Sequence, residues 1–559
     1  MKIASNILTP QLAFEYFKVA GKGSLEEKAS LWMKIVQHAA KKANFESLYH
    51  IYLQLFTNEK LPVAWMPDEK VIENANITSL QKELGIKNYR DLHTWSVENR
   101  AEFWEKTIER LGIKFQTPYK EVLNLSGGVE HPEWLSGAAY NITDSCFSAS
   151  PEEIAIVSGK EGSMEMENIS CGELKKRVNK FSSGLIKQGF KVGDRIILYM
   201  PLTVESIISY LGIIRAGMVV VSVADSFSSS ELKKRIEMTE AKGLVTCDGY
   251  LYGGKELEVI SKVRQAASIK TIICSYLQNI NLQSNELLWE NVTGSEEFEP
   301  HIGHPEDVTN ILFSSGTTKE PKSIPWTHIT PIKCASDAYY HHDIKPSDVV
   351  TWTTGMGWMM APWLIYASLI NKATLAVYSG AATGPGFGKF AEQAGITVLG
   401  TIPSVVKAWR NNAYEGKFNW KVRVFSSTGE PSNAEDYFYL MSLANFNAPV
   451  IEYCGGTEIG GGYITGSIVQ AASPATFTTP ALGVDFYLLN QDQKPTEGET
   501  PGEVFIVPPS IGLTQRLLNR DHHDEYYAGM PKGPAGEVLR KHGDAFEVVQ
   551  QLHTIFYKS

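Results

Sequence analysis

The sequence predicts an α/β protein: two doubly wound subdomains with mixed sheets, a small β-rich subdomain and an N-terminal helical extension. Short apolar runs at 194–200 and 218–224 flank a stretch with helical spacing at 204–214. This alternation is typical of βαβ units around a parallel sheet. The pattern then repeats, with strands expected near 307–313, 348–352, 373–378, 396–400, 422–426 and 449–453. We therefore expect one sheet within about 150–300 and a second within 301–455.

The two ends of the chain do not show this alternation of strand and helix patterns. Residues 1–110 are expected to be mainly helical, because Thr9-Pro10 has the form of a cap followed by proline at the first helical position. Thr78 and Gln81 suggest a capping box. No reactive side chains stand out here, so we expect a packing or interaction extension. Towards the C-terminus, glycine, proline and threonine surround short β runs, which predicts an antiparallel part over 456–545.

Composition limits the function. The 559 residues are 43% apolar and 20% charged, which is ordinary for a globular protein with large cores. The net charge of −10 argues against a nucleic-acid partner. No apolar run reaches the roughly 18 residues of a membrane span, the N-terminus lacks signal-peptide features, and the six cysteines show no CxxC spacing. We therefore expect a cytoplasmic protein with reduced thiols.

The stretch ILFSSGTTKEPKSIPWTH at 311–328 comes close to a phosphate-binding loop of the Walker type. That motif needs a second glycine before its lysine, but Pro321 stands there. Proline fixes φ and has no N–H to donate, so the Walker interpretation fails.

The same loop still has the chemistry of a phosphate site. It follows a predicted strand at its carboxyl end, where open α/β sheets bind ligands. Hydroxyl and amide donors, one glycine that permits close approach, and two cations are available: Ser314, Ser315, Gly316, Thr317, Thr318, Lys319 and Lys322. On these residues alone, a solvated Ser/Thr turn is the alternative.

Several motifs in order make the interpretation specific. SSGTTKEPK at 314–322 resembles the signature loop of AMP-forming acyl-CoA synthetases, with Lys319 where glycine is usual. The further matches follow in the family's order at 353–369, 426–431 (SSTGEP), 452–461 (EYCGGTEIGG), 501–507 (PGEVFIV) and 541–544 (KHGD). From about 95 to 544 the chain is similar to the acetyl-CoA synthetase and plant-type acyl-activating branch of this adenylate-forming superfamily. The resemblance implies an AMP-binding large domain over 111–545.

The resemblance also implies a reaction. A carboxylate attacks the α-phosphorus of ATP to give an acyl-adenylate and pyrophosphate, and the CoA thiol then displaces AMP. The implied partners are therefore a carboxylic acid, ATP, Mg²⁺ and CoA.

The resemblance implies a role for each residue that stands at a matching position of the family's motifs. The 314–322 loop would hold the β- and γ-phosphates. Thr457, Glu458 and Lys322 form the implied catalytic set, with Thr457 on the α-phosphate and Glu458 binding Mg²⁺ as a hard oxygen ligand. Taken alone, Glu458 would more often be a solvent-facing acid.

The remaining ATP contacts are implied in the same way. Tyr453 would stack on adenine and Asp544 would accept from the ribose hydroxyls; the alternatives are a core tyrosine and an ordinary turn aspartate. The other implied nucleotide residues are Gly429, Glu430, Pro431, Glu452, Cys454, Gly455 and Gly456. The YGGK stretch, with Gly253, Gly254 and Lys255, resembles a segment that contacts CoA phosphates.

The acyl pocket is implied at Trp358, Met359 and Gly455. Acetate-specific relatives place a tryptophan where Gly455 stands, so the glycine predicts room for an acid longer than acetate.

Only 15 residues follow Asp544, whereas the family carries a further domain with a catalytic lysine. We therefore expect 546–559 to be a short tail in place of that domain, and an impaired enzyme whose candidate partners are a separate C-terminal domain or further copies of this chain in a homo-oligomer. The alternatives are a non-catalytic ATP- or acyl-adenylate-binding module, half of a split enzyme, or an enzyme that loads a carrier protein instead of CoA.

Overall fold

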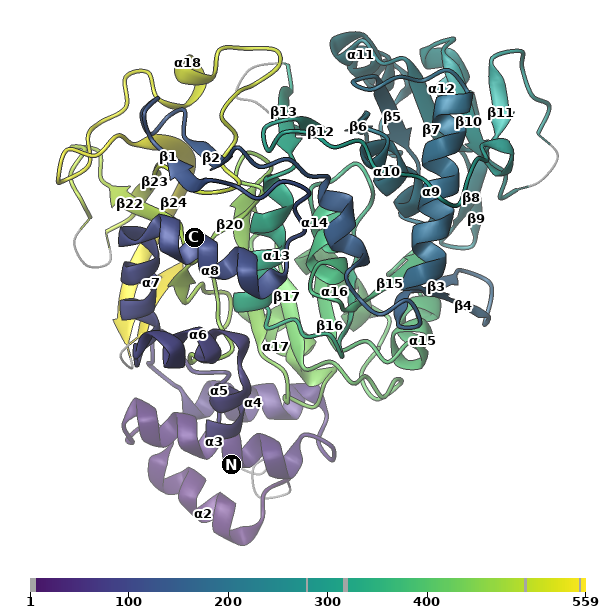
Figure 1. Cartoon of the computed structure of the whole chain (residues 1–559). Coiled ribbons are helices and arrows are strands. Elements are labelled where there is room, and N and C mark those ends of the chain that lie inside the picture. The colour runs from purple at the N-terminus through teal and green to yellow at the C-terminus, as the bar shows by residue number, and fades with distance from the viewer. Residues whose placement is uncertain (1–6, 278–279, 315–319, 497–499, 552–553, 559) are drawn as a thin grey trace.

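The computed structural model describes residues 7–277, 280–314, 320–496, 500–551 and 554–558. Two seven-stranded mixed sheets form its centre, with helices around them, N-terminal helices on one side and small sheets near the C-terminus (Figure 1). The predicted fold class is therefore confirmed.

The first sheet has the strand order β11-β10-β7-β5-β6-β12-β13. Every neighbouring pair is parallel except β12 and β13. Its strands are β5 (Arg195–Tyr199), β6 (Val219–Ser222), β7 (Gly243–Cys247), β10 (Lys270–Cys274), β11 (Glu286–Leu288), β12 (Val308–Ser314) and β13 (Lys322–Thr327).

The second sheet has the order β18-β17-β16-β14-β15-β3-β4, with only β3 and β4 antiparallel. Its strands are β3 (Ile154–Lys160), β4 (Met166–Ser170), β14 (Val349–Trp352), β15 (Thr374–Ser379), β16 (Val398–Thr401), β17 (Val424–Ser427) and β18 (Val450–Glu452).

The expected boundary near residue 300 does not separate the sheets. β3 precedes the first sheet in the chain but pairs with β15, with Ile156 opposite Leu375. β12 lies beyond residue 300 but pairs with β6, with Asn310 opposite Val220. The two halves therefore exchange strands, and a division by sequence position alone is wrong at this point.

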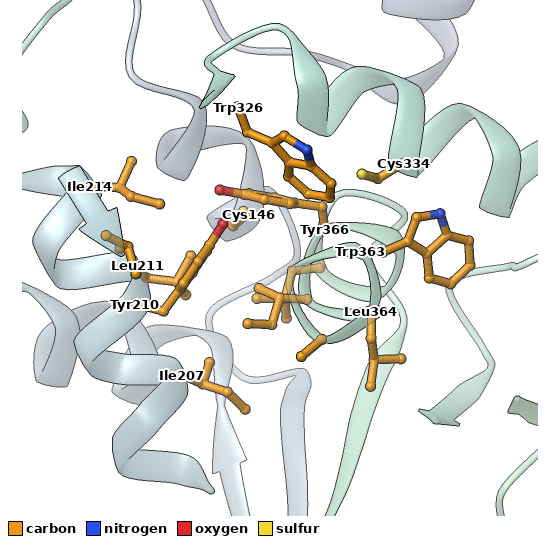
Figure 2. Packing of buried hydrophobic residues seen from close by; sticks show 14 of the residues in the cluster. Cys146, Ile207, Tyr210, Leu211, Ile214, Trp326, Cys334, Trp363, Leu364 and Tyr366 are labelled. Carbon is orange, nitrogen blue, oxygen red and sulfur yellow. The ribbon is translucent and has the colours of Figure 1, made fainter. Parts of the chain in front are cut away.

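Helices join the two halves into one core. Figure 2 shows α10 (Val204–Arg215) facing α14 (Met360–Leu369). The ring centres of Tyr210 and Tyr366 lie 6.0 Å apart across this contact. Both helices are buried on nearly every side, as expected of helices that are apolar all round. The other helices of this part are α9 (Cys171–Lys187), α11 (Ser229–Thr239), α12 (Ile260–Ala266), α13 (Thr330–Tyr340), α15 (Pro385–Gln393), α16 (Pro403–Asn411), α17 (Ala434–Ser442) and α18 (His522–Tyr526).

The N-terminal extension is divided between two cores. Its helices are α2 (Pro10–Val19), α3 (Leu25–Ala39), α4 (Phe45–Leu55), α5 (Glu69–Asn74), α6 (Asn76–Leu84), α7 (Tyr89–Glu98) and α8 (Arg100–Leu111). Helices α3 and α4 pack on α17, where the rings of Trp32 and Phe438 are 5.3 Å apart, whereas α6 to α8 join the main core. Thr9 caps α2 as predicted, but the expected capping box at Thr78 is wrong, because α6 begins at Asn76.

Strands also form the C-terminal part. A three-stranded sheet contains β19 (Cys454–Gly456), β20 (Gly461–Thr465) and β21 (Thr479–Pro480), and a four-stranded sheet contains β22 (Asp485–Leu489), β23 (Gly502–Val507), β24 (Arg540–Gln551) and β25 (Thr554–Lys558). The expected tail over 546–559 is therefore corrected, because its backbone continues β24 and then pairs with it as β25.

Candidate active site

A cavity of about 1490 Å³ opens where the parallel strands of both sheets end. Segments that follow strands directly or within three residues line it, including 225–227 after β6, 353–355 after β14, 428–431 after β17 and 453–458 after β18. This is the edge at which open α/β sheets bind ligands.

The cavity brings most of the predicted site residues together. Those that line it are Ser314, Trp358, Met359, Gly429, Glu430, Pro431, Glu452, Tyr453, Cys454, Gly455, Gly456, Thr457, Glu458 and Asp544. The predicted phosphate ligands Ser315, Gly316, Thr317, Thr318 and Lys319 lie outside the described residues. Their roles, and the others assigned from the motifs, stay predictions.

Lys322 and Glu458 form the charged centre of the site. The Nζ of Lys322, at the start of β13, lies 3.4 Å from Oε1 of Glu458 and 3.6 Å from Oε1 of Glu525. Burial would raise the pKa of Glu458, but the charges of Lys322 and Arg540 outweigh it and hold that pKa below its usual value. Glu458 is therefore a carboxylate at neutral pH. The indole of Trp326 donates to the carbonyl of Thr457 (2.7 Å) and fixes the adjoining backbone.

Arg540 is a second cation beside Glu458. It is fully buried, and none of its three guanidinium nitrogens has a hydrogen-bond partner of normal geometry among the described residues. Its guanidinium carbon lies 3.9 Å from the ring centre of Tyr526, and Lys322 Nζ lies 5.0 Å from the same ring. The cation–π contact with Tyr526 and the field of Glu458 therefore stabilise its charge.

Glu452 is a second buried carboxyl on the cavity wall, and its pKa is raised whereas that of Glu458 is lowered. It is buried at the end of β18, and its Oε1 has no hydrogen-bond partner of normal geometry among the described residues. Burial raises its pKa to about 8, against the weaker opposing effect of the Ser432 and Ser427 hydroxyls. Glu452 is therefore mainly protonated at neutral pH and offers a hydroxyl donor to the cavity wall.

Tyr453 points into the core instead of the cavity. Its hydroxyl donates to Asp337 Oδ2 (2.6 Å) and accepts from the Trp363 indole (3.1 Å). The side chain is almost fully buried. This geometry opposes the predicted stacking on adenine and supports the alternative of a core tyrosine. Asp337 also accepts from Gly462 N (2.8 Å) and pairs with buried Lys333.

Asp544 has the fixed geometry expected of a ligand acceptor. Its Oδ2 accepts from the Tyr463 hydroxyl (2.6 Å) and the Cys454 thiol (3.3 Å), and lies 3.1 Å from His542 Nε2. Burial opposes ionisation, but these hydrogen bonds lower its pKa to about 2. Asp544 therefore presents a permanent carboxylate to the cavity, more ordered than an ordinary turn aspartate.

Gly455 is required by the backbone. A Cβ at this position would lie 1.8 Å from the carbonyl oxygen of Gly461, on the neighbouring strand β20. The space that a side chain at position 455 would need is therefore already filled by β20. The predicted enlargement of the pocket by Gly455 does not follow from this structure. Room for a substrate comes from the rest of the cavity.

The carboxylate of Glu430 orders the implied nucleotide-binding segment of Gly429, Glu430 and Pro431. Gly429 has φ of +84°, which favours glycine. The Glu430 carboxylate accepts from the N–H (3.0 Å) and hydroxyl (2.9 Å) of Ser404, in the first turn of α16. Glu430 thus orients the loop and uses both carboxylate oxygens within the protein.

The predicted CoA turn is already occupied. Gly253 and Gly254 connect β8 (Gly249–Tyr252) and β9 (Lys255–Glu258), and their N–H groups donate to the Glu161 carboxylate at 3.0 and 2.7 Å. Ala381 N donates to it as well, at 2.8 Å. An internal carboxylate therefore fills the place predicted for a phosphate, which opposes that role for Gly253, Gly254 and Lys255 in this conformation.

Sequence reasoning missed two charged residues, Arg540 and Arg235. Arg540 stands two positions before His542 on an alternating strand, and Arg235 ends a basic run, Lys233-Lys234-Arg235, that resembles a solvated helix face. Residues two and four positions apart on a strand share one face, so the predicted site residue Asp544 could have indicated Arg540.

Comparison with known proteins shows the family. The AMP-binding enzyme model matches residues 144–514, and the acetyl-coenzyme A synthetase N-terminus model matches 89–146. The chain is 38% identical over 515 residues to "Probable acyl-activating enzyme 17, peroxisomal" of Arabidopsis thaliana, which covers 87% of this chain and 71% of that protein. It is 37% identical over 523 residues to "Hexanoyl-CoA synthase" of Cannabis sativa, covering 87% and 72%.

A solved structure agrees with this. "Acetoacetyl-CoA Synthetase from Streptomyces lividans" superposes with a TM-score of 0.80 at 25% identity, covering 89% of this chain and 79% of that one. The chain belongs to the AMP-binding enzyme family and is an AMP-forming acid–thiol ligase of the acetyl-CoA synthetase and plant acyl-activating branch. In the described part of the chain, no helix is long and apolar enough to cross a membrane. The expected cytoplasmic location stays a prediction, since the Arabidopsis relative is named peroxisomal.

The site could hold a magnesium ion through a protein carboxylate together with the phosphates of a substrate. Among the described residues, no group of three or more His, Cys, Asp or Glu side chains is placed to hold a metal. Glu458 is a buried, ionised oxygen donor on the cavity wall. This suits Mg²⁺, which binds through one or two carboxylates together with substrate phosphates.

Proposed function

We propose that this protein joins a carboxylic acid longer than acetate to CoA, with ATP as the energy source and an acyl-adenylate as intermediate. The observation that carries the proposal is that one cavity, of about 1490 Å³, is lined both by Glu458 and Asp544 and by the apolar side chains of Trp358 and Met359. The relative named hexanoyl-CoA synthase supports a substrate of this size.

The first step needs charge control around the α-phosphate. The acid's carboxylate oxygen bonds to the α-phosphorus of ATP, and the bond to the bridging oxygen breaks to release pyrophosphate. Lys322 would supply positive charge to the departing phosphates, moving from its 3.4 Å contact with Glu458. Glu458 would hold Mg²⁺, and the charge of the ion would neutralise that of the phosphate oxygens.

The nucleoside would be held by groups that are ordered in advance. Asp544 would accept from the ribose hydroxyls, since its carboxylate is fixed by Tyr463 and His542. Glu452 and the 429–431 segment would contact the adenine. In the second step the CoA thiol gives up its proton to solvent and its sulfur attacks the acyl carbon. The bond from that carbon to the phosphate oxygen then breaks, and AMP leaves with its electrons.

Trp358 is the residue of choice for testing substrate size. Its side chain is 52% exposed at the cavity, and its ring meets that of Phe227 at 6.0 Å. Truncation therefore removes apolar wall without opening a buried core.

The experiment measures pyrophosphate release with a series of straight-chain acids from acetate to decanoate. The wild type is expected to be fastest with an acid longer than acetate, and Trp358→Ala to change the ratio of rates between short and long acids. Phe14→Ala, which removes an aromatic ring 72% exposed on α2, is the matched control and should leave the ratio unchanged. A maximum at acetate would refute the proposed substrate class.

A further inference from the structure

Arg235 is a buried cation in the cavity wall that the proposed reaction does not use. It lies on α11, lines the cavity and is only 5% exposed. Its guanidinium carbon lies 4.4 Å from the ring centre of Phe227 and 5.0 Å from that of Phe313. Two aromatic contacts therefore hold the planar group in place without a ligand.

The hydrogen bonds of Arg235 are incomplete. Its Nη1 donates to the carbonyl (2.9 Å) and to Oε2 (2.6 Å) of Glu231, one helical turn earlier. Its Nε is buried and has no hydrogen-bond partner among the described residues. A buried donor without a partner destabilises the folded state, so folding alone leaves this donor unexplained.

A second unpartnered group belongs to the same part of the wall. Ser314 follows Phe313, whose ring contacts the guanidinium, and it also lines the cavity. Its Oγ is buried without a partner in the described part of the chain. Glu231, the carboxylate bonded to Arg235, is about half exposed and is not among the residues that line the cavity.

From this arrangement we infer that Arg235 binds a diphosphate group of a substrate, with Ser314 as a neighbouring donor. Guanidinium is the side chain best suited to phosphate oxygens, because it presents several donors in a rigid plane. The inference rests on the proposed function, in which two substrates, ATP and CoA, each carry a diphosphate. The carboxylic acid carries none.

The test compares ligands with and without the diphosphate. Binding is measured by calorimetry for ATP against AMP, and for CoA against pantetheine. For Arg235→Met we expect about 10- to 100-fold weaker binding of ATP or of CoA, since a hydrogen bond to a charged group is worth about 1.5–3 kcal/mol. If ATP loses affinity, the diphosphate is that of ATP, and if CoA loses affinity, it is that of CoA. The affinity for the ligand of that pair without a diphosphate, AMP or pantetheine, should change less than about threefold. This is a smaller effect than the loss of one such hydrogen bond.

Two further variants keep the test decisive. Arg235→Lys retains the charge but not the rigid plane, so it should recover part of the lost affinity and should fold even if the methionine variant does not. Lys233→Met, on the exposed side of the same helix, is the matched control and should bind all four ligands as the wild type does.

Three results have distinct meanings. Unchanged binding of ATP and CoA by the Arg235 variants would overturn the inference, and so would an equal loss for AMP and pantetheine. A wild type that binds neither ATP nor AMP would instead overturn the proposed function.

Discussion

The raised pKa of Glu452 predicts a stability that falls as the pH rises. The folded-state pKa is about 8, whereas the ordinary value is 4.5. Between these values the folded protein holds a proton that the unfolded chain has released, so the stabilisation present below pH 4.5 is lost as the pH approaches 8. Each pH unit changes the free energy of unfolding by up to about 1.4 kcal/mol, and the whole interval by at most about 5 kcal/mol.

Glu452→Gln removes this dependence, because the amide keeps the shape and a donor but does not ionise. We expect the variant to match the wild type closely at pH 5 and to be more stable by several kcal/mol at pH 8, of the order set by the linkage relation. The assay is the urea midpoint at pH 5, 6, 7 and 8 for both proteins, with Glu256→Gln, an exposed carboxyl on β9, as control. If the difference between variant and wild type is the same at every pH, Glu452 is not neutral in the folded state and the reasoning fails.

Three further predictions concern other parts of the site. Gly455→Ala should lower stability by about 1–3 kcal/mol, because its Cβ meets the Gly461 carbonyl at 1.8 Å; an unchanged melting temperature would contradict this. Asp337→Asn should cost about 3–5 kcal/mol in urea unfolding by leaving Lys333 buried without a counter-charge, and a cost below 1 kcal/mol would be inconsistent with that account. Glu161→Gln should speed amide hydrogen exchange in the β8–β9 turn with little change in melting temperature, and equal exchange would show that the carboxylate does not hold the turn.

Much of the fold was readable because parallel strands are buried on both faces. Apolar runs such as 194–200 and 218–224 therefore stood out and became β5 and β6. The pairing partner of a strand could not be predicted from the sequence. Nothing in the residues of β3 indicates that it pairs with a strand more than 200 positions later.

The motifs placed the site well, but not the direction of each side chain. Glu452, Thr457 and Glu458 follow β18 and reach one cavity, as ordered motifs predict. Tyr453 turns inward because Asp337 lies beneath it, on a helix whose position depends on tertiary packing. Arg235 was missed for a similar reason, since a basic run on a helix looks solvated until aromatic rings cover it.

The exchange of strands between the two sheets affects how the protein acquires its structure. Neither half can complete its own sheet until segments from the other half have been made and brought back, so the closing contacts span long loops that are slow to form. Cutting the chain near residue 300 should thus give two fragments with open sheet edges and a tendency to aggregate, whereas coexpression of both pieces gives each edge its missing strand.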